Sequence, residues 1–274
     1  MTTRNWRTKS NRAGCTVYLT CKKNNSIDSY VPNTLTISPF TNVGTYTWTA
    51  PSYVTSVDYL IVGGGGGGGA AYDTGSGGGG GGGLVLTGSL VVTPGTTYSI
   101  VVGAGGNGGN ATTDGTYRQE YNGEDGSDSS FSTIIALGGG GGYKSRSANT
   151  TDSRDGLGGY ASNNNVAPTG GNGAGSRVGG ENGGGGGGNS SAGGSSNSTP
   201  NISRTAGAGL ISNLSGSNVT YGAGGVGGIV DQSYNGSDAS DNTGNGGGGA
   251  TSFSFDYKLG GNGGSGIVIL KYYI

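Results

Sequence analysis

Uninterrupted runs of glycine are the feature that most restricts the folds open to this chain. The runs occupy residues 63–69, 77–83, 138–142, 183–188 and 246–249. Glycine disfavours the α-helix by about 1 kcal/mol per residue relative to alanine, so these runs are not expected to be helical. A flexible linker is the main alternative, because ordering one residue costs roughly 1–2 kcal/mol and one hydrogen bond contributes about 0.5–1.5 kcal/mol net. An isolated run should therefore be disordered, whereas a bundle of mutually paired runs could be ordered.

A second glycine pattern, with a period of three, favours the ordered bundle. Pairs of glycines separate single other residues, which are Ala104, Asn107 and Asn110; Leu157 and Tyr160; Ala223, Val226 and Ile229; and Asn262 and Ser265. A polyproline-II-type helix has three residues per turn, rises about 3.1 Å per residue and makes no internal hydrogen bonds. Its amides can pair with neighbouring helices, and glycine allows the close approach. We predict a packed bundle of polyglycine II helices, with pure runs inside and period-three segments at the boundary.

The chemistry of the period-three residues predicts which way each segment faces. Polar residues should lie in solvent, and these are Asn107, Asn110, Asn262 and Ser265. The apolar column of Ala223, Val226 and Ile229 should face a sheet or another core.

Blocks of alternating or β-branched residues predict β-strands between the glycine blocks. These blocks are residues 45–49, 56–62, 84–92, 97–102, 131–137, 251–259 and 267–273. Their number suits a small antiparallel β-sandwich. No stretch has a useful helical period, so almost no α-helix is expected. We predict one glycine-rich β/polyglycine II domain over residues 39–274 and an N-terminal segment over residues 1–38.

The chain lacks the residues on which most catalytic and metal sites depend. It contains no histidine, which is the commonest general base and metal ligand, and no Gly-Lys-Ser/Thr phosphate loop. We therefore expect no enzyme activity, no cofactor and no metal site. Two acidic groups could hold Ca²⁺ through oxygen ligands, namely Glu124, Asp125 and Asp128, and Asp231, Asp238 and Asp241. Neither group matches an EF-hand, and solvated loop carboxylates are the favoured interpretation.

Cys15 and Cys21 are the two cysteines of the chain. In a straight strand they would lie roughly 20 Å apart, from about 3.3 Å of rise per residue. A disulfide needs Cα atoms within about 7 Å, so these residues could be bridged only if the segment folds back as a hairpin. Two small buried apolar side chains are the favoured alternative.

The N-terminal segment is basic before its first acidic residue, Asp28. Its residues include Arg4, Arg7, Lys9 and Arg12. A solvated, partly disordered arm is the plain interpretation, and docking onto an acidic partner surface is the functional one. Nucleic acid is the less favoured partner.

Signals for export or membrane insertion are not visible in the sequence. Residues 1–14 contain no apolar core of a signal peptide. No stretch approaches the about 20 apolar residues of a membrane span. We expect no membrane span and assembly in a cytoplasm.

Tyrosine with arginine, asparagine and serine marks the loops between glycine blocks. This composition is typical of recognition loops, where rigid rings combine with adaptable polar groups. The candidate binding residues are Tyr117, Arg118, Tyr121, Tyr143, Lys144, Arg146 and Tyr234. The equally weighted alternative is that the tyrosines shield the ends of the bundle.

The order of motifs resembles the glycine-rich domain of phage tail and other viral proteins. The similar segments are residues 40–51, 57–65, 92–106 and 263–269. The chain is also similar to the polyglycine II tip adhesins of phage long tail fibres, and to the glycine-rich region of anaplastic-lymphoma-type receptor kinases. The second resemblance implies a jelly-roll, TNF-like β-sandwich beside the polyglycine II bundle.

The resemblance to tip adhesins implies a virion surface or tail-fibre protein that binds a host-surface protein or glycan through the loops. Such a protein would assemble in the host cytoplasm, contact other virion proteins and be exposed on the particle. The alternative is a purely structural, self-assembling capsid or fibre component with no receptor binding. An exposed final strand or the apolar column could support a homo-oligomer such as a trimer.

Overall fold

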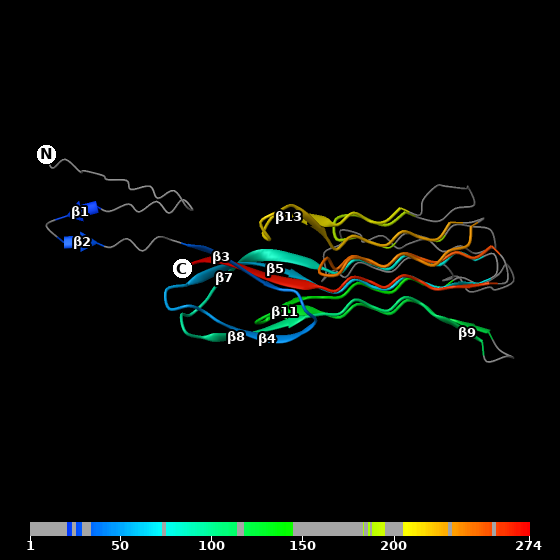
Figure 1. Cartoon of the computed structure of the whole chain (residues 1–274), viewed down its shortest axis with the longest axis horizontal. Coiled ribbons are helices and arrows are strands. Elements are labelled where there is room, and N and C mark those ends of the chain that lie inside the picture. Colours follow the sequence, from blue (N-terminus) through cyan, green and yellow to red (C-terminus); the bar gives the residue numbers. More distant parts are fainter. Residues whose placement is uncertain are drawn as a thin grey trace, which may run out of the picture.

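The computed structural model describes most of the chain after residue 33. The described residues are the strands β1 (Cys21–Lys23) and β2 (Ser26–Asp28), followed by 34–72, 75–113, 118–144, 183, 186, 188–194, 205–229, 232–253 and 256–274. Figure 1 shows two parts, a strand framework on the left and long glycine segments that run away from it to the right. The C-terminus lies at the framework end. We call that end the sheet end and the opposite one the distal end.

Two four-stranded antiparallel sheets form the framework. The first has the order β3 (Leu35–Phe40), β16 (Ile267–Tyr273), β5 (Ser56–Val62) and β7 (Val85–Val91). The second has the order β12 (Ile134–Ala136), β11 (Ser129–Phe131), β8 (Thr97–Val102) and β4 (Gly44–Thr49). Among the described residues every regular element is a strand and none is an α-helix. The all-β prediction is confirmed.

The remaining strands form short antiparallel pairs. They are β1 with β2, β9 (Ala111–Thr113) with β10 (Arg118–Glu120), β13 (Leu210–Ser212) with β14 (Val219–Tyr221), and β6 (Ala71–Tyr72) with β15 (Tyr257–Lys258).

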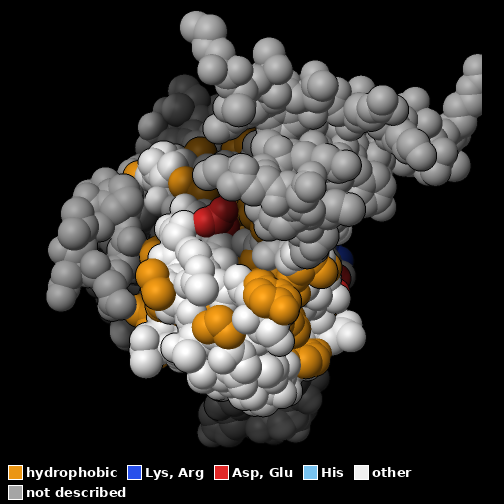
Figure 2. Space-filling view, turned by 90° about the vertical axis from the view of Figure 1, so that its left-hand side faces the viewer, with side chains coloured by type: hydrophobic (Ala, Val, Ile, Leu, Met, Phe, Trp, Pro, Cys, Tyr) orange, Lys and Arg blue, Asp and Glu red, His pale blue; other side chains and the backbone are white. Residues whose placement is uncertain are grey.

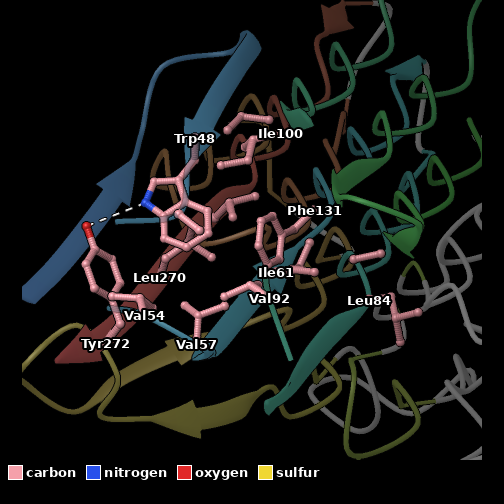
Figure 3. Close-up of a cluster of buried hydrophobic side chains, with 14 residues drawn as sticks. Trp48, Val54, Val57, Ile61, Leu84, Val92, Ile100, Phe131, Leu270 and Tyr272 are labelled. Atoms are coloured by element: carbon pink, nitrogen blue, oxygen red, sulfur yellow. Dashed lines mark hydrogen bonds between the residues drawn. The ribbon is translucent and has the colours of Figure 1, made fainter. Parts of the chain in front are cut away.

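One hydrophobic core joins the two sheets, as Figure 3 shows. Trp48 and Ile100 come from the second sheet, whereas Ile61 and Leu270 come from the first. Phe131 is fully buried between them, and its ring lies edge-on to that of Trp48 at a centroid distance of 6.0 Å. The indole Nε1 of Trp48 donates a hydrogen bond to the Tyr272 hydroxyl at 3.5 Å. This packing fits an antiparallel β-sandwich.

The strands predicted from sequence agree with the structure where apolar runs are unbroken. β5, β8 and β16 have the predicted bounds. The block at 131–137 is instead a hairpin of β11 and β12, because Ser132 adopts a left-handed conformation at φ 56° and reverses the chain. Among the described residues of the block at 251–259, only the two-residue strand β15 and isolated bridges occur. β3 crosses the predicted domain boundary at residues 38/39, and the boundary itself stays a prediction.

β16 lies between β3 and β5, with antiparallel partners on both of its edges. The final strand therefore has no exposed edge through which it could support a trimer, and the oligomeric state stays a prediction.

The glycine segments hydrogen-bond to one another in a regular array, which we call the glycine array. Its longer described segments are residues 63–70, 77–84, 103–110, 121–128, 137–144, 222–229, 234–241, 244–251 and 259–266, and Gly183, Gly186 and Gly207 also pair with it. Residues 63–69 lie at its centre. Along this segment each third amide donates to the same neighbour: Gly63, Gly66 and Gly69 donate to Leu84, Gly81 and Gly78; Gly64 and Gly67 donate to Ser127 and Glu124; Gly65 and Gly68 donate to Gly264 and Gly261.

The carbonyl groups of the central segment accept from three further neighbours. The donors are Gly139 and Gly142, Gly106 and Gly109, and Gly247 and Ala250. A neighbour therefore lies on every side, and a Cβ atom added at Gly66 would collide with the carbonyl oxygen of Gly140. The hydrogen-bonding period of three matches the period found in the sequence.

Burial of the pure glycine runs follows the prediction with one exception. The runs at 63–69, 77–83 and 246–249 are buried throughout, whereas the run at 138–142 is partly exposed. This run still needs glycine, because a Cβ atom at Gly138 or Gly141 would meet the carbonyl oxygen of Gly126 or Gly123. Of the run at 183–188, residues 183, 186 and 188 are described, and they are buried.

The predicted faces of the period-three segments are correct for asparagine only. Asn107, Asn110 and Asn262 are exposed as expected. Ser265 is buried, because its hydroxyl accepts from the amide of Asn242 at 2.9 Å inside the array. Val226 is 45% exposed, so the apolar column does not face a core at this position. Leu157 and Tyr160 lie outside the described residues.

Ser129 connects the second sheet to the glycine array. Its buried hydroxyl accepts from the amide of Gly103 at 2.9 Å. Ser129→Ala should lower the free energy of unfolding by about 1–2 kcal/mol, because a buried amide loses its acceptor. Denaturant unfolding measures the change. Ser130→Ala is the matched control and should have a smaller effect, since Ser130 is only half-buried; equal losses would contradict the role of the Ser129 hydroxyl.

Candidate recognition site at the distal end of the glycine array

Three of the tyrosines predicted as binding residues lie together at the distal end. Tyr121 begins one array segment, and its carbonyl accepts from the amide of Ala70 at 3.4 Å. The carbonyl of Tyr143, at the end of another segment, accepts from Gly78 at 2.9 Å. Tyr234 pairs with Thr251 through backbone hydrogen bonds of 2.9 and 3.1 Å. The array register therefore brings three separate loops to one level of the molecule.

The other predicted residues are only partly placed. Lys144 follows Tyr143 and is half-buried. Arg118 begins β10, which pairs with β9 beyond the array (Figure 1), and its side chain lies outside the described residues. Tyr117 and Arg146 lie outside the described residues, as do the arm residues Arg4, Arg7, Lys9 and Arg12. Cys15 lies outside them too, so the two alternatives for the cysteines stay open.

Sequence reasoning missed a pair of stacked aromatic rings at the distal end. Tyr72 in β6 and Tyr257 in β15 have ring centroids 4.6 Å apart and an interplanar angle of 24°. Phe253 precedes Tyr257 by four residues, and its side chain is 57% exposed. The aromatic content of residues 251–259 is visible in the sequence, but the block was predicted only as a strand. Tyr72 is buried, so the stacked pair packs inside this end of the molecule, whereas Phe253 is exposed there.

A single ion pair accompanies the stacked rings among the residues that the structure describes. Lys258 Nζ lies 2.6 Å from Asp256 Oδ2. The hydrogen bond from Lys258 holds the pKa of the Asp256 carboxyl below its ordinary value. Asp256 is exposed, so solvent screens this pair and it contributes little to stability. Asp256 thus stays ionised at neutral pH.

Tyr234 serves the array as well as the surface. Its hydroxyl oxygen accepts from the amide of Ile229 at 3.2 Å. The neighbouring Ser233 hydroxyl accepts from the amide of Phe253 at 3.1 Å. These bonds support the alternative in which tyrosine shields the end of the bundle at this position. Tyr121 is exposed and is the better candidate for contact with a partner.

Two acidic residues of the first predicted cluster, Asp125 and Asp128, accept hydrogen bonds from backbone amides of the array. The side-chain oxygens of Asn122, Asp125 and Asp128 accept from the amides of Lys144, Gly141 and Gly138 at 3.0, 2.7 and 2.8 Å. These amides belong to the partly exposed segment 137–144, at the boundary of the array. We call this set the first ladder.

A second ladder has the same composition. The side-chain oxygens of Asn235, Asp238 and Asp241 accept from the amides of Leu259, Asn262 and Ser265 at 3.0, 2.7 and 3.4 Å. The paired segments run in opposite directions in the first ladder and in the same direction in the second. The carboxylates of both ladders are therefore not merely solvated, as the sequence had suggested, but complete the hydrogen bonding of boundary segments.

A repeated motif marks the two ladders in the sequence. Residues 122–128 read Asn-Gly-Glu-Asp-Gly-Ser-Asp, and residues 235–241 read Asn-Gly-Ser-Asp-Ala-Ser-Asp. The period of three between the acceptor residues equals the period of the array. Comparison of the two acidic clusters with each other, rather than with calcium motifs, could have found this role.

Neither metal binding nor membrane insertion receives support from the described part of the chain. Among these residues no group of three or more histidine, cysteine, aspartate or glutamate side chains is placed to hold a metal ion. The same residues contain no helix with the length and apolarity needed to cross a membrane.

The sheet end presents a different, apolar surface. Figure 2 views the molecule from this side and shows hydrophobic side chains spread among polar ones. Tyr53, in the loop between β4 and β5, is 92% exposed, and Val91, at the end of β7, is 82% exposed. Tyr273 is exposed near the C-terminus. Exposed apolar side chains therefore occur at both ends of the molecule.

A comparison with known proteins places nearly the whole chain in one family. A model described as a glycine-rich domain matches residues 41–273. The match covers both sheets except for β3, which precedes it, and it covers the whole glycine array. No curated protein matches the chain.

Proposed function

Since the chain belongs to the glycine-rich domain family, we propose that it is a non-catalytic virion surface or tail-fibre protein that binds a host-surface protein or glycan through its distal loops. The observation that carries the proposal is that backbone pairing in the array brings Tyr121, Tyr143 and Tyr234 from separate loops to the distal end. This end lies opposite the C-terminus (Figure 1). In this proposal the particle is assembled in the host cytoplasm. The sheet end faces other virion proteins, and the distal end faces the host.

The glycine array gives these loops a rigid support. We propose that its segments are polyglycine II helices, because they pair with neighbours at every third residue and surround one all-glycine segment. For the framework we propose the jelly-roll, TNF-like class, supported by two packed four-stranded antiparallel sheets. Loops on such a scaffold can vary in sequence while the scaffold stays unchanged.

Labelling and competition test the location and the role together. Antibodies against the chain should label the surface of particles purified from the organism that encodes it. The purified chain should compete with those particles for adsorption to host cells. Particles that carry no label would overturn the virion proposal, and labelled particles whose adsorption is unaffected by the purified chain would overturn receptor binding.

Tyr121→Ala should weaken this competition about tenfold or more, because loss of a central aromatic contact costs on the order of 2 kcal/mol of binding. Tyr53→Ala is the matched control, since it removes an exposed tyrosine from the opposite end of the molecule. Competition binding measures both variants, and circular dichroism verifies that both are folded. If Tyr121→Ala competes as well as the unchanged chain, the assignment of the distal surface is wrong.

A purely structural, self-assembling role is the second candidate, and the exposed apolar side chains of the sheet end favour it. In that case Tyr53→Ala and Val91→Ser should impair incorporation into particles, and no distal substitution should change adsorption. The two candidates therefore differ in which end of the molecule is sensitive.

A further inference from the structure

Asparagine followed by glycine occurs repeatedly inside the glycine array. The described pairs are Asn107-Gly108, Asn122-Gly123, Asn235-Gly236, Asn245-Gly246 and Asn262-Gly263. In an unfolded chain this dipeptide is the one most prone to deamidation, because glycine has no side chain to hinder attack by its own amide nitrogen. A chain with so many pairs should be chemically short-lived unless the fold protects them.

Deamidation needs a particular movement of the two groups. The glycine amide nitrogen gives its proton to a base and attacks the asparagine Cγ atom, a carbon–nitrogen bond forms, and the side-chain nitrogen leaves as ammonia. Water then opens the succinimide ring at one of its two carbonyl carbons, and the product is aspartate or isoaspartate. No oxidant or reductant takes part. The nitrogen must therefore be free to approach Cγ.

The array occupies each of the attacking nitrogens. Four of them donate to backbone carbonyl oxygens of neighbouring segments: Gly123 to Gly142 at 2.8 Å, Gly236 to Leu259 at 2.8 Å, Gly246 to Ala223 at 2.8 Å and Gly263 to Gly106 at 2.9 Å. The amide of Gly108 donates to Asn262 Oδ1 at 2.9 Å. Attack would require each of these bonds to break first.

The asparagine side chains are held as well. Four of them accept, through Oδ1, a hydrogen bond from a backbone amide: Asn122 from Lys144 at 3.0 Å, Asn235 from Leu259 at 3.0 Å, Asn245 from Ala223 at 2.8 Å and Asn262 from Gly108 at 2.9 Å. Asn107 Nδ2 donates to Glu124 Oε2 at 2.7 Å. Each side chain thus reaches to a neighbouring segment and not back to its own following nitrogen.

We propose that the glycine array shields these asparagine–glycine pairs from succinimide formation, so that isoaspartate in the protein records the time it has spent unfolded. Isoaspartate adds one carbon to the backbone and displaces every following amide from the period of three. A chain modified at Asn122 or Asn235 therefore cannot pair again in its array position. Loss of the fold becomes irreversible on the time scale of deamidation.

Peptide mapping by mass spectrometry tests the proposal on the full chain. Folded and denaturant-unfolded samples are incubated in the same mildly alkaline buffer, and deamidation is followed at each pair. In the folded sample two hydrogen bonds must break at each site before the nitrogen can attack. We therefore expect deamidation there to be about tenfold slower or more than in the unfolded sample. Equal rates in the two samples would overturn the proposal.

An internal control separates the array from folding in general. Val43→Gly places a glycine after Asn42 in the exposed turn between β3 and β4, outside the array. In the folded variant Asn42 should deamidate at nearly the rate of the unfolded sample, whereas the five array pairs stay intact. Protection of Asn42 equal to that of the array pairs would show that array bonding is not the cause, and overturn the proposal. If this variant does not fold, the comparison of folded and unfolded wild-type protein decides alone.

Discussion

Gly66→Ala is expected to abolish folding of the glycine array or to lower the free energy of unfolding by more than about 4 kcal/mol, an exceptional loss for one methyl group. The new Cβ atom would collide with the carbonyl oxygen of Gly140 and the backbone of Gly139. The obstacle is backbone that itself accepts a hydrogen bond from Gly81 at 2.8 Å, so it cannot move away without breaking the array. Denaturant unfolding and amide hydrogen exchange measure the loss.

Asn107→Ala is the matched control for this prediction. It also leaves an alanine in an array segment, but at an exposed position where a side chain is already accommodated. Only the hydrogen bond to Glu124 is lost, so a change below about 1 kcal/mol is expected. A Gly66→Ala protein that unfolds like this control would show that residues 63–69 do not lie at the centre of the array.

Removal of the first ladder should produce the second largest effect. In the triple variant Asn122→Ala, Asp125→Ala and Asp128→Ala, the amides of Lys144, Gly141 and Gly138 lose their acceptors. These groups are partly reached by water, which replaces some of the lost bonding, so about 1 kcal/mol per bond and about 3 kcal/mol in total is expected. Denaturant unfolding measures the total, and hydrogen exchange should accelerate first at the three amides.

The variant Asp125→Asn with Asp128→Asn separates the acceptor atom from the charge. It keeps an oxygen at each position, as Asn122 does in the same ladder, and should keep most of the stability. A loss equal to that of the triple alanine variant would show that negative charge, rather than the hydrogen bond, matters. Unchanged exchange at Gly138 and Gly141 in the triple variant would contradict the ladder itself.

Much of the framework could be predicted because its strands are continuous in sequence. Ser56–Val62, Thr97–Val102 and Ile267–Tyr273 are rich in residues suited to a pleated, half-buried surface, and the structure has the same bounds. β3 was not among the predicted strands, and it crosses the predicted boundary at residues 38/39. Its pairing with β16, across more than two hundred residues of sequence, is what makes it a strand.

The candidate site was predictable only in its residue types. Tyr121, Tyr143 and Tyr234 were identified because tyrosine stands beside glycine blocks, and the array register then brought them to one end. Tyr72 and Tyr257 could not be connected from the sequence, because their contact depends on the pairing of β6 with β15. The same limit applies to the ladders, whose acceptor residues are regular in sequence but whose donors lie in other segments.

The sequence by itself determined that glycine must repeat with a period of three and that ordered runs must satisfy one another's amides. Both follow from local backbone geometry, which depends only on residue type and spacing. The tertiary structure decided which run occupies the centre, which runs need side-chain acceptors at the boundary, and which tyrosines meet at the distal end. Glycine segments are nearly identical to one another, so their places are set by the strands and turns that fix their ends and by the hydrogen bonds that only particular neighbours can complete.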